Sequence, residues 1–122
     1  MFIMDKYNFS ITINQGEDAS FTYHKDGYPT ISDLDFYFTV KPLNSTTTDD
    51  SDAVYQLNPD NVIFIDYDIY HPQSIAVIKI SDSEIILNPD VYKYDLKEVN
   101  GDTEVVRLQA NYIVKQSVTK RV

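Results

Sequence analysis

The side chains that most often carry chemistry are scarce in this sequence. It contains two His, His24 and His71, and no Cys. Neither His has a second His or a Glu at metal-ligand spacing, so we expect both on the surface or at a strand edge. The lack of Cys excludes disulfides and thiolate sites. Ser and Asp are plentiful, but no Gly-x-Ser-x-Gly elbow is present. The sequence therefore predicts no catalytic residues, no metal site and no enzyme.

Two acidic segments could be considered for cation binding or acid–base work. Asp49-Asp50-Ser51-Asp52 offers oxygen ligands for Ca²⁺, but it lacks the central Gly and closing Glu of an EF-hand loop. We expect a solvated loop there. Asp66 and Asp68 flank Tyr67, and nothing around them implies a pocket that would shift a pKa. The three Gly form no phosphate-binding motif, so no cofactor is expected.

Charge limits the possible partners. The 122 residues carry 19 Asp and Glu against 10 Lys and Arg, a net charge of −9. This charge disfavours binding to nucleic acid and to anionic membranes. Lys115, Lys120 and Arg121 place three of the ten basic residues in the last eight positions. We expect residues 115–122 to form a basic tail, which is either a solvated, frayed terminus or an arm that docks on an acidic neighbouring subunit. Tyr112 completes this candidate interface, because Tyr is enriched at interfaces.

Targeting signals are not expected. The longest aliphatic or aromatic runs are four residues, at 62–65 and 75–78, whereas a membrane-spanning helix needs about 20. Residues 1–4 are too short for the apolar core of a signal peptide. We therefore expect neither a signal peptide nor a transmembrane segment.

The elements that must position all these residues are short strands. Apolar side chains alternate with polar ones, as in sheets with one buried face. The cleanest run places Leu34, Phe36 and Phe38 on one face, and Pro42 ends it. The expected strands are 9–13, 19–23, 34–40, 54–57, 62–65, 74–80, 92–97 and 106–114.

Turn residues separate these strands. Asp26-Gly27 and Asn100-Gly101 predict tight turns, and the second is a type I′ hairpin signal. A polar loop is expected over 44–52. Ser83 and Glu84, followed by apolar residues and Pro89, predict one short helical turn.

Seven or eight short strands with turns every eight to twelve residues or so are typical of an immunoglobulin-like sandwich. We therefore predict an all-β fold, an antiparallel β-sandwich with one short helical turn. Residues 1–122 are expected to form a single domain, in which residues 1–6 are a loose N-terminus.

Several segments in order carry a family resemblance. They are Gly16-Glu17-Asp18, Lys25-Asp26-Gly27-Tyr28-Pro29, Phe38-Thr39-Val40-Lys41, Tyr92-Lys93-Tyr94-Asp95-Leu96, Val105-Val106-Arg107-Leu108 and Tyr112-Ile113-Val114. From Gly16 to Thr119 the chain resembles the small immunoglobulin-like domains of tailed-bacteriophage virion proteins. These include the N-terminal domains of baseplate upper proteins and short tail or head proteins of cyanophages. The chain departs from the family at Pro89-Asp90, where Pro-Gly is usual, and at Ala110-Asn111, where a small-residue or Glu-Gly step is usual.

The resemblance implies a non-enzymatic structural protein of the virion, made in the host cytoplasm. Its implied partners are other virion structural proteins, of the tail, neck, baseplate or capsid, and we expect multiple copies in a symmetric assembly. A tail, baseplate or neck position is favoured. The alternatives are a capsid decoration protein, or a carbohydrate- or Ca²⁺-binding β-sandwich module that uses exposed Tyr and the 49–52 loop.

Overall fold

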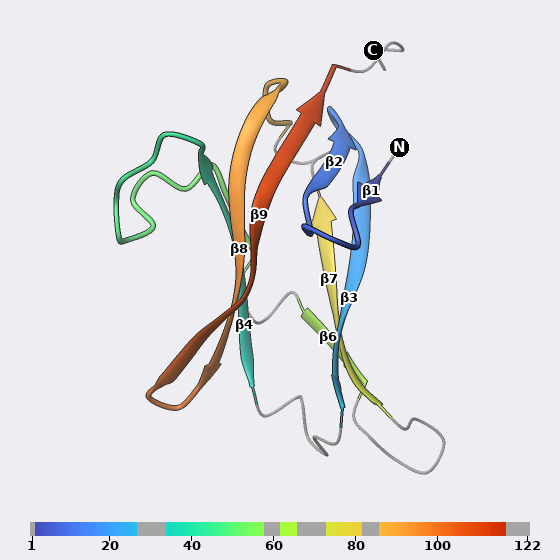
Figure 1. The fold of residues 1–122 in the computed structure, drawn as a ribbon, viewed down its shortest axis with the longest axis vertical. Coiled ribbons are helices and arrows are strands. Elements are labelled where there is room, and N and C mark those ends of the chain that lie inside the picture. The colour runs from blue at the N-terminus through green and yellow to red at the C-terminus, as the bar shows by residue number, and fades with distance from the viewer. Residues whose placement is uncertain (1, 27–33, 58–61, 66–72, 82–85, 117–122) are drawn as a thin grey trace.

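Alternating apolar side chains build two β-sheets that pack face to face (Figure 1). The computed structural model describes residues 2–26, 34–57, 62–65, 73–81 and 86–116. Within these ranges the fold is all-β, as predicted, with no helix that could cross a membrane. The strands are β1 (Ile3–Met4), β2 (Ile11–Asn14), β3 (Asp18–Asp26), β4 (Asp35–Pro42), β5 (Tyr55–Leu57), β6 (Val62–Ile65), β7 (Gln73–Ser81), β8 (Asp90–Asn100) and β9 (Thr103–Lys115).

The order of seven of these strands is that of an immunoglobulin-type sandwich. Sheet A has the order β1-β2-β9-β8-β4-β5, and sheet B has the order β3-β7-β6. In the immunoglobulin scheme, sheet B corresponds to strands B, E and D, and β9-β8-β4-β5 correspond to G, F, C and C′. The described pairings are antiparallel except for β2 with β9, which is parallel. The predicted antiparallel β-sandwich is thus confirmed, apart from this one parallel pair.

An aromatic cluster occupies the middle of the core. The Phe38 ring lies 5.2 Å from Tyr94, 5.9 Å from Phe21, 6.2 Å from Tyr55 and 6.3 Å from Tyr112, measured between centroids. Phe21 belongs to sheet B and the other four to sheet A, so the cluster joins the two layers. Tilted and edge-on ring pairs add to the free energy gained by burying their area. In this Cys-free chain the cluster links the sheets where antibody domains have a disulfide.

A tyrosine corner fixes the start of β8. The Tyr92 hydroxyl donates a 2.7 Å hydrogen bond to the backbone carbonyl of Asn88, four residues upstream. Immunoglobulin-type sandwiches have a Tyr at this place, and its hydroxyl bonds back to the preceding loop. Alternation had predicted only that Tyr92 begins the 92–97 strand, not that its hydroxyl makes this bond.

A bulge in β9 changes which side chains face the core. Leu96 lies opposite Leu108, but the next residue, Lys97, lies opposite Val106, so Arg107 is the extra residue on β9. A one-residue shift moves the following side chains to the other face. Val106, the first apolar residue of the expected 106–114 strand, is therefore 48% exposed instead of facing the core.

The β8–β9 hairpin turns one residue later than predicted. Asn100 pairs with Thr103, so the two turn residues are Gly101 and Asp102 rather than Asn100 and Gly101. Gly101 has φ +59°, and among the described non-Gly residues only Phe9 and Ile86 have positive φ. A positive φ at the first turn residue alone fits a type II′ turn, which takes Gly there, and not the predicted type I′.

Several other predictions concern residues that lie wholly or partly outside the described ranges. The first residues of the predicted helical turn, Ser83 and Glu84, lie outside them, and residues 86–88 are irregular. The Asp26-Gly27 turn extends beyond the described residues, and Asp66, Asp68 and His71 lie outside them. Residues 1–6, expected to be loose, contain β1, which pairs with β2.

Candidate functional site

The residues predicted to form the C-terminal interface lie in different environments. Lys115 ends β9 and is exposed, as an interface residue must be. Tyr112 is only 1% exposed, and its ring contacts Phe38 in the core. Its place in the interface was a wrong prediction, because β9 turns this side chain toward sheet B. Lys120 and Arg121 lie outside the described residues.

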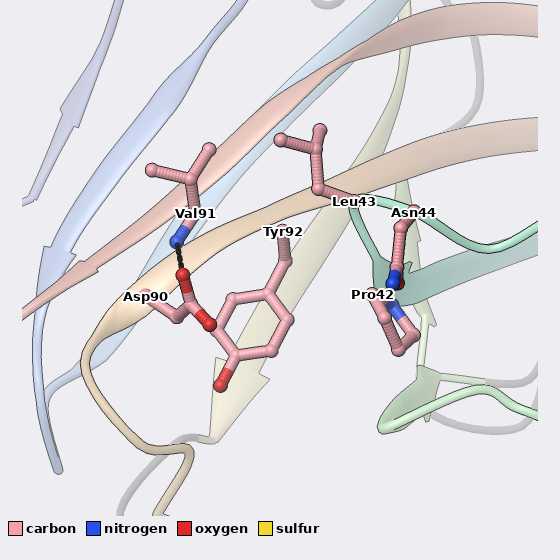
Figure 2. A pocket seen from close by; sticks show the side chains of 6 residues that line it. All are labelled: Pro42, Leu43, Asn44, Asp90, Val91 and Tyr92. Carbon is pink, nitrogen blue, oxygen red and sulfur yellow. Dashed lines mark hydrogen bonds between the residues drawn. The ribbon is translucent and has the colours of Figure 1, made fainter.

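A hollow of about 440 Å³ lies near Lys115, at the same end of sheet A. Its lining comes from the end of β4 and the start of β8, and we call it the end hollow. It is lined by Pro42, Leu43, Asn44, Asp90, Val91 and Tyr92. Figure 2 shows the Leu43 and Val91 side chains projecting to one side of β8 while the Tyr92 ring points to the other.

Local backbone rules shape the end hollow. Pro42 pairs with Tyr92 and is the last residue of β4, since a Pro cannot donate to a further ladder. The chain then turns away, with the Ser45 amide donating to the Pro42 carbonyl at 2.9 Å. At the start of β8, the Asp90 carboxylate accepts the Val91 amide at 2.7 Å. These contacts leave two large apolar side chains in solvent, Leu43 at 52% and Val91 at 36% exposure.

The acidic loop over 44–52 is anchored rather than freely solvated. The Lys41 ammonium donates to the backbone carbonyls of Asp49 and Thr47, and lies 3.8 Å and 4.0 Å from the carboxylates of Asp50 and Asp52. This ammonium therefore supplies positive charge beside the loop carboxylates. The prediction that this segment is irregular is confirmed. Its attachment to β4 was not predicted.

Two further side chains hold the loop against sheet A. The Lys93 ammonium on β8 donates to the Ser45 carbonyl at 2.6 Å. The Gln56 side-chain amide on β5 donates to Asp50 at 2.7 Å and to Thr39 at 3.2 Å. The loop is therefore hydrogen-bonded to β5 and β8 as well as to β4.

The loop carboxylates bond to protein donors. Asp49 accepts the Ser51 hydroxyl and amide at 2.6 Å and 3.1 Å, and these bonds hold its carboxyl pKa below the usual range. Hydrogen bonds from Ser45 and Thr47 lower the pKa of Asp52 in the same way. Across the described part of the chain, no three His, Asp or Glu residues converge as a metal site would require. The geometry gives no support to Ca²⁺ binding by this loop.

Beside the loop, the outer face of sheet A is polar and hollowed. Two cavities of about 180 and 170 Å³ share Thr39, Lys41, Thr48 and Asp95 as lining residues. Burial raises the pKa of the Asp95 carboxyl above its ordinary value. This surface combines hydroxyl, ammonium and carboxylate groups, which suit a small polar ligand.

The β9 bulge positions an ion pair. Arg107 Nε and Nη2 donate to Glu98 Oε2 at 3.0 Å and 2.6 Å, and Glu98 is 5% exposed. The hydrogen bond to Glu98 raises the guanidinium pKa of Arg107. Because each group neutralises the other, removal of either partner alone would leave an unpaired charge, so we interpret the pair as structural.

The second apolar surface is at the N-terminus. We call Ile3, Tyr7 and Phe9 the N-terminal tip; their side chains are 51%, 83% and 41% exposed. The Lys6 ammonium lies 5.1 Å from the centroid of the Tyr7 ring, within cation–π range. Phe9 was predicted to start an inward-facing strand, but β2 begins two residues later, at Ile11.

Hydrogen bonds hold the backbone of the tip. Asp5 Oδ1 accepts the amides of Tyr7 and Asn8 at 2.7 Å and 3.2 Å, and the Asp5 carbonyl accepts the Phe9 amide at 2.8 Å. The Asp5 amide donates to the Ser10 carbonyl, also at 2.8 Å. Phe9 has φ +61°, a costly conformation for a bulky side chain. A residue stays in such a conformation only where surrounding contacts enforce it.

The remaining His gives no sign of a site. The His24 ring is exposed on β3, and its Nε2 lies 2.9 Å from the Thr22 hydroxyl. This agrees with the predicted surface position.

No family model and no curated protein matches this sequence.

Proposed function

We propose that this protein is a non-enzymatic structural protein of a tailed-bacteriophage virion. It acts as an accessory subunit that docks on a larger symmetric assembly, in the tail, baseplate or neck. The observation that carries this proposal is the pair of exposed apolar surfaces, the N-terminal tip and the end hollow, on well-braced backbone. Ordered apolar side chains in solvent are characteristic of protein–protein contacts.

The fold supports the same function. The resemblance in sequence is to immunoglobulin-like virion domains, and the observed strand order is of that type. Lys115 and the end hollow lie at one end of sheet A, so a partner could contact both. A net charge of −9 leaves the rest of the surface acidic and suits it to solvent.

Quantitative mass spectrometry of purified particles tests the proposal. The chain should be present in a fixed ratio to the major tail protein through successive density gradients. A copy number on the order of tens supports the tail, baseplate or neck, whereas hundreds support capsid decoration. Particles that lack the chain, from cells that produce it, would overturn the virion function.

A carbohydrate-binding module is a second candidate, favoured by the two polar cavities beside Asp95. Sugar hydroxyls need both donors and acceptors, which Lys41, Thr48 and Asp95 provide. A glycan array followed by NMR titration tests it. A specific glycan should shift the amide signals of β4 and β8, and Asp95→Ala should abolish binding. No glycan bound at millimolar concentration would remove this candidate.

A further inference from the structure

We propose that the N-terminal tip of one copy docks into the end hollow of a second copy, so that chains associate head to tail. The two surfaces are complementary in form: one is a projection with exposed apolar side chains, and the other is a depression with mixed lining in which Leu43 and Val91 are exposed. This inference goes beyond the virion function, because it concerns the isolated chain and requires no other protein.

The tip is ordered before any partner binds. Four hydrogen bonds around Asp5 fix the loop that carries Tyr7 and Phe9. The core also holds this loop, because the buried Tyr94 hydroxyl donates to the Phe9 carbonyl at 2.5 Å. A pre-ordered aromatic side chain loses little conformational entropy on docking. Tyr is also among the residues that contribute most to binding energy at protein interfaces.

The end hollow has the size and lining to receive an aromatic ring. Its volume of about 440 Å³ lies within the range of roughly 300–1,000 Å³ found for ligand pockets. Leu43 and Val91 project on the same side of β8 (Figure 2) and supply apolar contacts. Covering them removes two exposed apolar side chains from water, which favours association.

Charge selects this occupant over an uncharged apolar one. Lys6 stands beside Tyr7 in the tip, and Asp90 lines the hollow. With Tyr7 inserted, the Lys6 ammonium is carried toward the Asp90 carboxylate. Opposite charges at the rim of an interface set its orientation and raise the association rate.

The positions of the two surfaces make the contact head to tail. The tip belongs to β1 and the β1–β2 loop, at one edge of sheet A, whereas the hollow lies between β4 and β8, near the other edge (Figure 1). Different patches on the two copies form a heterologous interface, which generates a closed ring or an open filament.

Sedimentation velocity of the purified chain over a range of concentrations tests the inference. Wild type should show species larger than a dimer as concentration rises. Tyr7→Ser removes the tip ring and Leu43→Glu blocks the hollow, and each alone should weaken self-association at least about tenfold. Val106→Ser is the matched control, because Val106 is a comparably exposed apolar residue away from both surfaces. Circular dichroism establishes that each variant is folded.

Mixing the two variants gives the sharper result. Tyr7→Ser retains an intact hollow and Leu43→Glu an intact tip, so an equimolar mixture should form dimers and nothing larger. Lys6→Glu or Asp90→Lys alone should weaken association, and the two together in one chain should restore it. A wild type that stays monomeric at millimolar concentration, or a mixture that stays monomeric, overturns the inference. Neither result bears on whether the chain is present in virions.

Discussion

Tyr94 and Phe9 are joined by a hydrogen bond from the phenolic hydroxyl to the backbone carbonyl, at 2.5 Å, although 85 positions separate them. Tyr94 lies in the aromatic cluster, with its ring 5.2 Å from that of Phe38, while Phe9 lies in the exposed N-terminal tip. The bond connects the hydrophobic core to Phe9, a surface residue with a strained backbone conformation. It explains why the tip keeps its shape although its side chains are in solvent.

Tyr94→Phe should loosen the tip while leaving the core packed. The variant keeps the ring and loses one hydrogen bond, so the free energy of unfolding should fall by about 1 kcal/mol. Urea denaturation measures this change, and amide exchange should quicken at Tyr7, Asn8 and Phe9. Tyr37→Phe, on a partly exposed β4 residue, is the control and should change neither quantity. Unaltered exchange in the tip of Tyr94→Phe would contradict the bracing function.

The same hydroxyl predicts sensitivity to alkali. Burial raises the pKa of Tyr94 from 10.0 to about 12. The folded chain therefore holds this proton to higher pH than the unfolded chain does. The resulting stability is complete below pH 10 and is lost as the pH rises through about 12. Urea midpoints of wild type should fall across this window, and those of Tyr94→Phe should fall less. If the urea midpoints of wild type and Tyr94→Phe fall equally with pH, another group controls alkaline unfolding.

The alternation of side chains predicted most of the fold. Leu34, Phe36, Phe38 and Val40 face the core as expected, because period-two spacing and burial determine each other in a sheet. The pattern fails at Val106, because a bulge is a property of the pairing between two strands. It cannot be seen in the sequence of either strand alone.

The candidate site was less predictable. The prediction of an interface from Lys115 relied on charge along the chain and stays a prediction, since Lys115 is exposed at the end of β9 whether or not a partner binds there. The end hollow depends on Pro42 and Tyr92 becoming neighbours, although they are 50 positions apart in the sequence. The tip could have been found from Asp5 and Asn8, which are typical of local side chain-to-backbone turns. Phe9 and Ile11 instead suggested a continuous strand.

Arg107→Ala should lower the free energy of unfolding more than replacing Arg107 and Glu98 together. It leaves the buried Glu98 carboxylate without the guanidinium that donates two bonds to it. Loss of hydrogen bonds to a buried charged group costs about 2 kcal/mol. Replacing both partners, as Glu98→Gln with Arg107→Gln, should recover part of the loss because no charge remains buried. Urea denaturation of the wild type and the two variants measures this difference, and a double variant no more stable than Arg107→Ala would contradict the pairing.

Asp95→Asn should stabilise the protein at neutral pH. Burial raises the pKa of Asp95, so its contribution to stability is favourable when the carboxyl is protonated and is lost as the pH rises. At pH 7 the charged carboxylate therefore opposes folding, and the neutral amide relieves this cost. The gain in thermal midpoint should shrink as the pH falls toward about 4. Asp35→Asn, at an exposed position on β4, is the control. A pH-independent gain would point to packing rather than charge.

Truncation after Gln116 should separate the basic tail from the strand that precedes it. Lys115 pairs with Asn14 and its carbonyl accepts the Gln15 amide at 2.7 Å, so a deletion that included Lys115 would also damage sheet A. Removing 117–122 spares these contacts and should leave the thermal midpoint unchanged. If the tail docks on an acidic subunit, incorporation into particles should fall several-fold. The full-length variant Lys120→Ser with Arg121→Ser should lose as much, because attraction between opposite charges is the proposed cause. Normal incorporation of both variants, measured by mass spectrometry, would mean that docking depends on the folded domain alone.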